Sequence, residues 1–227
     1  FIAISLQERP AATVLYQRLC RLMPAWWGFG LIVFLSGFFY AKGAGISLET
    51  TFAWLFPYQQ VTWNLDNAYA NDAVVITWYI AAYLWLMLLS PILLYVYRKL
   101  SWIAVYAPVV IALIYSHFFP EQDTIFGETL FNVLIFSGCW MLGFTKADGE
   151  IEKLPKYIIY LTALVFSLCG VLLTYQEGSL GGNPTALAIM SFGIAMLLLH
   201  FNPDLSFLPT FSKTVIRTMN TFAVTIY

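Results

Sequence analysis

Charge is scarce in this sequence: only 10% of its 227 residues are Asp, Glu, Lys or Arg, whereas 60% are hydrophobic. That apolar share exceeds what a soluble core of this size needs. The formal net charge of −1 excludes a nucleic-acid-binding protein that relies on electrostatic attraction. The composition therefore indicates an integral membrane protein. In such a protein an ionisable group near an apolar segment is energetically costly and is by default functional or paired.

Cysteine and histidine are scarce as well. Cys20, Cys139 and Cys169 are odd in number and far apart, so they give neither a disulfide framework nor a metal-ligand spacing, and we expect free thiols and no metal. His117 and His200 are the only histidines, and the sequence places no nucleophile beside either. The chain also lacks Gly-x-Ser-x-Gly and His-Glu-x-x-His patterns, so it has no self-contained catalytic signature.

Long apolar blocks are present, and they predict an all-α, polytopic transmembrane bundle rather than an outer-membrane barrel. Six full spans are expected, at 23–41, 73–95, 102–119, 125–144, 156–175 and 184–200. Residues 1–6 look like the end of an earlier span, and 214–227 look like the start of a later one. Because the chain also begins without Met, we expect one transmembrane domain over 1–227 that is truncated at both ends.

The basic residues fall almost entirely on one side of these spans. With residues 1–22 inside, ten of the eleven Lys and Arg residues are cytoplasmic and only Lys42 is outside. The positive-inside rule therefore predicts a multi-pass protein of the cytoplasmic (inner) membrane, with 1–22 cytoplasmic and the connection 42–72 extracytoplasmic. The polar stretch 145–156 reads as a cytoplasmic connection with a turn at Asp148-Gly149.

Two arginines, Arg18 and Arg21, stand where the first full span begins. On a helix, residues three apart have Cβ atoms roughly 5–6 Å from each other, so the two guanidiniums can hold a phosphate or pyrophosphate at the inner membrane face. Topology anchoring by the positive-inside rule explains the same pair. Spacing alone leaves both interpretations open.

Glu128 and Asn132 lie four residues apart on the span 125–144, so they share a helix face about one turn below the outer surface. An acid at that depth is by default functional or paired, although it is also shallow enough to reach interfacial water.

The outer connection 42–72 adds aromatic rings interleaved with amides and a carboxylate, which fit either a sugar platform or an aromatic belt at the headgroups. The rings are Trp54, Phe56, Tyr58, Trp63 and Tyr69, and the polar residues are Gln59, Gln60, Asn64 and Asp66.

The sequence Arg18-x-x-Arg21-Leu22-x-Pro24 stands ahead of a span. It is followed, in order, by the run from Trp78 through Leu84 to Ser90-Pro91, the span from Asn132 to Asp148-Gly149, and the closing segment 220–227. These four motifs resemble segments of the membrane-bound acyltransferase-3 family, the O-acyltransferases that modify bacterial surface glycans and related acceptors, and the first is similar to that family's Arg-x-x-Arg motif. Together the motifs cover nearly the whole chain.

The resemblance implies transfer of an acyl group, acetyl or similar, from acyl-CoA on the cytoplasmic side to a hydroxyl of a glycan or lipid-linked acceptor outside. Arg18 and Arg21 would then bind the donor, and Glu128 would be a candidate catalytic group. The acceptor or pocket would involve Trp78, Tyr79, Tyr83, Asn132 and Tyr227.

The family's essential histidine would lie upstream of this chain, so the fragment alone would be inactive. No cofactor is implied beyond the donor substrate, and the partners are membrane lipid, acyl-CoA and the acceptor. A transporter for an anionic or lipid-linked substrate and a non-catalytic membrane scaffold remain the alternatives.

Overall fold

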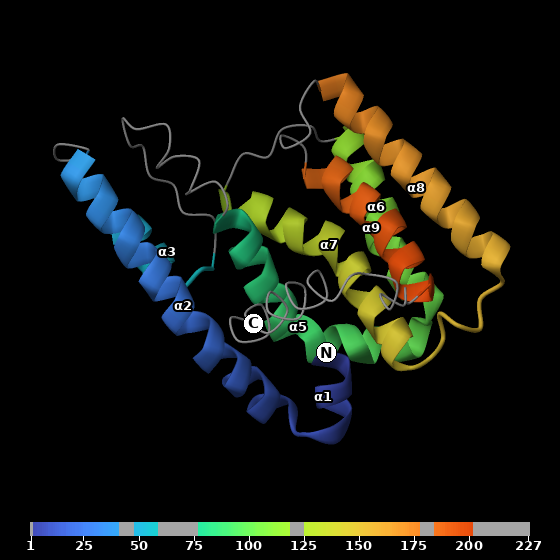
Figure 1. The fold of residues 1–227 in the computed structure, drawn as a ribbon, viewed down its shortest axis with the longest axis horizontal. Coiled ribbons are helices and arrows are strands. Elements are labelled where there is room, and N and C mark those ends of the chain that lie inside the picture. Colours follow the sequence, from blue (N-terminus) through green and yellow to red (C-terminus); the bar gives the residue numbers. More distant parts are fainter. Residues whose placement is uncertain (1, 41–47, 59–76, 119–124, 178–183, 202–227) are drawn as a thin grey trace, which may run out of the picture. The chain divides into compact units, whose positions relative to one another are not determined.

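The computed structural model describes residues 2–40, 48–58, 77–118, 125–177 and 184–201. Within those ranges every regular element is an α-helix and none is a strand (Figure 1). In chain order the helices are α1 (Ile2–Glu8), α2 (Ala11–Tyr40), α3 (Leu48–Leu55), α5 (Thr77–Leu100), α6 (Trp102–Phe118), α7 (Ile125–Ala147), α8 (Lys156–Glu177) and α9 (Pro184–Phe201). The predicted all-α, helical membrane bundle is confirmed.

The helices fall into two compact units. One unit contains Phe1–Glu8 and Trp85–Asn202, so it holds α1, the second part of α5, and α6 to α9. The other contains Arg9–Leu84 and Pro203–Tyr227, so its described helices are α2, α3 and the start of α5. The expectation of a single domain over 1–227 stays a prediction.

Three helices in the described part of the chain are long and apolar enough to cross a bilayer, namely Thr77–Leu100, Gly127–Ala147 and Lys156–Tyr175. Trp102–Ile114 and Thr185–Phe201 are shorter apolar helices. All five lie on predicted spans, and the count of six stays a prediction. The predicted span at 214–227 lies outside the described residues.

Helix α2 begins well before the predicted span at 23–41. Its first turn forms directly after Pro10, whose carbonyl accepts hydrogen bonds from the amides of Thr13 (3.0 Å) and Val14 (3.2 Å). No helix breaker follows until Pro24, and the helix continues through that proline to Tyr40. The arginine pair therefore lies on a formed helix and not on a loop that precedes one.

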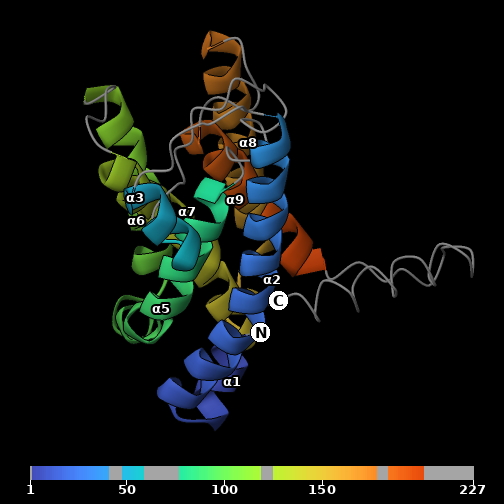
Figure 2. The same cartoon turned by 90° about the vertical axis from the view of Figure 1, so that its left-hand side faces the viewer.

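In the first unit, α8 and α9 pack closely and run side by side (Figures 1 and 2). A Cβ at Gly193 would lie 2.8 Å from the carbonyl oxygen of Ala163, and a Cβ at Gly170 would lie 2.9 Å from that of Ala186. Such contacts are typical of membrane helices, where small residues let two backbones approach.

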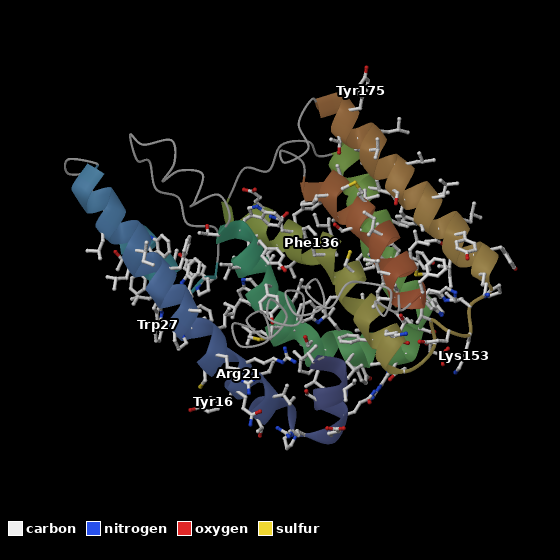
Figure 3. The ribbon with its side chains drawn as sticks, in the orientation of Figure 1. Tyr16, Arg21, Trp27, Phe136, Lys153 and Tyr175 are labelled. Carbon is white, nitrogen blue, oxygen red and sulfur yellow. The ribbon has the colours of Figure 1, made fainter. Side chains whose placement is uncertain are left out.

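The side of α8 away from α9 is strongly exposed and apolar. It presents Leu161, Leu164, Leu168, Leu172 and Tyr175, of which Tyr175 is 85% exposed at the end of the helix (Figure 3). In a membrane protein this surface is the one expected to contact lipid tails.

Helix α7 ends in a glycine turn, as the Asp148-Gly149 pair predicted. Gly149 has φ +70°, and its amide donates to the carbonyl of Lys146 (3.2 Å). The amide of Glu150 donates to the carbonyl of Thr145 (2.9 Å), which completes a Schellman motif. Beyond the turn, an ion pair joins Lys146 to Glu152 at 2.5 Å.

This turn is also tied to the start of the chain. The side-chain Nε2 of Gln7 on α1 donates to Asp148 Oδ1 at 2.7 Å. The hydrogen bond from Lys146 lowers the pKa of Glu152, and a hydrogen bond to Glu150 raises the pKa of Lys153. Both shifts favour the charged forms, so the connection remains a charged surface segment.

We predict that Gly149→Ala lowers the free energy of unfolding by about 1 kcal/mol, because a Cβ is disfavoured in the left-handed region. The measurement is the melting temperature of the detergent-solubilised protein, which should fall by about 2–4 °C. Gly149→Asn is the control, since Asn tolerates this conformation and should recover most of the loss. An unchanged melting temperature for Gly149→Ala would show that the turn contributes nothing.

Candidate functional site

The arginine pair lies in the first half of α2, in the second unit. Arg18 is half-buried and Arg21 is exposed. At 3.6 residues per turn, Tyr16 and Trp27 fall on one side of α2 and the two arginines on the opposite side. Figure 3 agrees, because Arg21 leaves the helix on a different side from those two rings.

Neither guanidinium of the pair has an ion pair or hydrogen bond to any residue that the structure describes. Helix α2 itself contains no Asp or Glu, so it offers no carboxylate to the pair. The neighbouring Arg9 differs, since its guanidinium donates to Gln17 Oε1 at 3.4 Å. Two adjacent, unpaired guanidiniums one helical turn apart are well suited to hold an anion with several oxygens.

The side of α2 away from the arginine pair carries two weakly acidic side chains, Tyr16 and Cys20. The pKa of Tyr16 is raised by its hydrogen bond with Cys20, which lies one turn further along the helix. Cys20 is an exposed free thiol, and Cys139 and Cys169 are free as well. Both acids of the pair lie away from the arginine side of the helix.

The predicted pocket aromatics lie at the start of α5. Trp78 and Tyr79 meet edge to face with ring centroids 6.0 Å apart, and Tyr83 follows Tyr79 by one turn on the same side. Tyr79 is 44% exposed, whereas Trp78 and Tyr83 are half-buried. Tyr227, the other residue expected at the pocket, lies outside the described residues.

Glu128 and Asn132 lie one turn apart on α7, in the first unit. Glu128 is half-buried, and Asn132 is only 1% exposed. The structure thus keeps the predicted shared face on one formed helix. The arginine pair and this α7 face belong to different units.

The histidines remain without an assigned role. The side chain of His117 lies outside the described residues. His200 ends α9 with its ring edge-on to Phe201, at a centroid distance of 5.7 Å, and its buried Nδ1 has no hydrogen-bond partner in the described part of the chain.

Trp54, one of the rings considered for a sugar platform, is part of the packing between α2 and α3. It stacks on Trp26 with centroids 5.1 Å apart, and its carbonyl accepts a hydrogen bond from Trp26 Nε1 at 2.8 Å. Trp27 Nε1 likewise donates to the carbonyl of Leu55 at 2.9 Å. One face of Trp54 is therefore covered, and Trp63 and Tyr69 lie outside the described residues.

The serine of the Ser90-Pro91 motif has a structural role that the sequence did not reveal. Ser90 is completely buried, and its Oγ donates to the carbonyl of Leu86 at 2.8 Å. The same oxygen accepts a hydrogen bond from Trp140 Nε1 of α7 at 2.9 Å. The motif thus joins α5 to α7, a contact between distant residues that no local sequence pattern specifies.

Comparison with known proteins places these features in a family. None of the curated proteins and none of the solved structures compared with the chain matches it. The family described as an acyltransferase domain matches over residues 1–227, the whole sequence. Together with the apolar helices, this match identifies a multi-pass membrane protein with an acyltransferase domain. The chain belongs to the acyltransferase-3 family.

Proposed function

We propose that this membrane acyltransferase moves an acyl group from acyl-CoA to a hydroxyl of an extracytoplasmic glycan or lipid-linked acceptor. In the transfer, a carbon–oxygen bond forms to the hydroxyl as the thioester carbon–sulfur bond breaks. The hydroxyl proton leaves to a base and ends on the sulfur of CoA. Glu128 is the candidate base on a described helix.

The observation that supports the proposal is the arginine pair on α2, which has no ion pair or hydrogen bond to any described residue. Coenzyme A has a pyrophosphate and a ribose phosphate, and arginine forks bind such oxygens with two parallel hydrogen bonds. A pair that served only to anchor topology would need charge, but it would not need two forks one turn apart on the same side.

The sidedness of the proposal follows from charge counting. Ten of the eleven Lys and Arg residues fall on the side that contains Arg18 and Arg21. That side is proposed to be cytoplasmic in the inner membrane, where acyl-CoA is available. Glu128 lies in the first turn of α7, at the end of the predicted span that charge counting puts on the opposite side, where the acceptor is proposed to bind.

The test is a calorimetric titration of the full-length protein with acetyl-CoA. We predict that Arg18→Ala or Arg21→Ala weakens binding about 10- to 100-fold, because hydrogen bonds to charged groups contribute roughly 1.5–3 kcal/mol. Arg21→Lys should recover only part of the affinity, since lysine lacks the planar fork.

Arg9→Ala is the matched control for this titration. It removes the same charge from the same predicted cytoplasmic segment, but Arg9 already bonds to Gln17 and lies outside the pair. Its affinity for acetyl-CoA should stay close to wild type. Unchanged affinity in both Arg18→Ala and Arg21→Ala would refute the donor site.

A further inference from the structure

Asn132 is a polar side chain buried in a membrane helix without a satisfied acceptor. The residue is 1% exposed, and its Oδ1 receives no hydrogen bond from any described residue. A buried carbonyl oxygen without a donor costs free energy, and the cost is larger where no water is present. Such an atom in a native bundle calls for an explanation.

Three other polar side chains of α7, two buried and one half-buried, do have hydrogen-bond partners. Ser137 Oγ donates to the carbonyl of Leu134 at 2.7 Å, and Thr145 Oγ1 donates to that of Leu142 at 2.8 Å. Trp140 Nε1 donates to Ser90 Oγ on α5. These groups are therefore satisfied within α7 or by α5, whereas Asn132 Oδ1 has no donor among the described residues.

Residues next to Asn132 on α7 pack against α6 and α9. Phe131 and Phe136 pack against the buried cluster of Ala112, Ile135 and Ala188, which joins α7 to α6 and α9. Cys139, two turns beyond Asn132 on the same side, donates its thiol to the carbonyl of Ala188 at 3.6 Å. A side chain held in such surroundings keeps its orientation, as a binding contact requires.

The chemistry of the face selects its ligand. Glu128 lies one turn away on the same side and has no ion pair in the described part of the chain. An amide oxygen beside a carboxylate offers hydrogen-bond acceptors and no positive charge. It would repel phosphate, so it does not suit the donor, but it suits a neutral group with several hydroxyls.

We infer that the Glu128–Asn132 face of α7 is an acceptor subsite, in which Asn132 Oδ1 receives a hydrogen bond from a hydroxyl of the glycan or lipid-linked acceptor. This inference rests on the proposed function for the existence of such an acceptor. It assigns the recognition of the acceptor to α7 and separates it from the arginine pair on α2.

The experiment compares Asn132→Leu with the wild type in membranes that contain the full-length protein. Labelled acetyl-CoA is the donor and the cell-envelope fraction supplies the acceptor. The amount of envelope that gives half-maximal transfer should rise about tenfold, which corresponds to one lost hydrogen bond. Affinity for acetyl-CoA should not change. Asn132→Asp keeps an acceptor oxygen and should restore part of the loss.

The melting temperature is a second readout, because it distinguishes a binding role of Asn132 from a structural one. If Asn132 stabilised the fold, Asn132→Leu would lower the melting temperature. Because Leu removes an unsatisfied buried group, Asn132→Leu should melt at the same temperature or higher. Ser137→Ala is the matched control on the same helix and should leave half-saturation unchanged, since its hydroxyl bonds within α7.

Half-saturation within twofold of wild type for Asn132→Leu, or a melting temperature several degrees lower, would overturn the inference. Failure of the donor site would show itself separately, as unchanged acetyl-CoA affinity in Arg18→Ala and Arg21→Ala. The two proposals can therefore fail independently.

Discussion

The double variant Arg18→Ala/Arg21→Ala is expected to lose acetyl-CoA binding by about 10²- to 10⁴-fold and to transfer almost no label to the envelope. Each guanidinium contributes charge-assisted hydrogen bonds, and no other residue described on α2 supplies a comparable pair. The two effects need not add fully, because neighbouring residues that share one ligand are coupled. The measurements are calorimetric titration and acetyl transfer in membranes.

The matched comparison is Arg18→Lys/Arg21→Lys. It keeps both positive charges, so it preserves any anchoring role, but it removes both planar forks. Phosphate binding predicts that the lysine variant loses most of the affinity while an epitope tag placed after Asp66 stays accessible from outside intact cells. Equal affinity in the lysine variant and the wild type would favour simple anchoring. Loss of tag access in the alanine variant would point to inverted topology.

The positions of the helices could be predicted from the sequence because their signal is local. An apolar block long enough to cross the bilayer must form a helix, since no water satisfies its backbone there. For this reason α6, α8 and α9 match the predicted spans at 102–119, 156–175 and 184–200 closely. The glycine turn at 149 was also predictable, because Asp-Gly strongly favours a turn.

The contacts that decide the site could not be predicted in the same way. The pairing of Trp26 with Trp54 and of Ser90 with Trp140 joins residues far apart in the chain, and no local pattern specifies the partner. Ser101, between α5 and α6, adopts the left-handed conformation with φ 50°. Serine seldom adopts this conformation, so the sequence does not predict it. The short helix α3 likewise falls inside a stretch that the sequence suggested only as a connection.

The candidate site also has features that the sequence predicts and features that only the structure shows. The spacing of Arg18 and Arg21, and that of Glu128 and Asn132, follows from helix geometry alone, and the structure keeps both pairs on formed helices. Among the described residues, the arginines have no carboxylate partner and Asn132 Oδ1 has no donor, and both are tertiary facts. They depend on which side chains the fold brings near, and so they add information to the motifs.

The packing of α8 on α9 leads to the second large effect, which is on stability. Gly193→Ala should lower the free energy of unfolding by about 1–3 kcal/mol, although alanine is normally the better helix former. The added methyl would lie 2.8 Å from the carbonyl oxygen of Ala163 and 2.8 Å from Ser167 Oγ. A backbone carbonyl cannot rotate away, so the helices must separate and lose contacts. Gly193→Leu should prevent the bundle from folding.

Gly143→Ala on α7 is the control that makes this result specific. A Cβ at Gly143 meets no atom of the described residues within 4 Å, so the same substitution should raise stability by about 0.5–1 kcal/mol through helix propensity alone. The measurement is the melting temperature in detergent, where the two variants should shift in opposite directions. A rise for Gly193→Ala as large as that for Gly143→Ala would mean that α8 and α9 do not approach this closely. In that case the lipid-facing surface assigned to α8 would also have to be revised, because it is defined as the side away from α9.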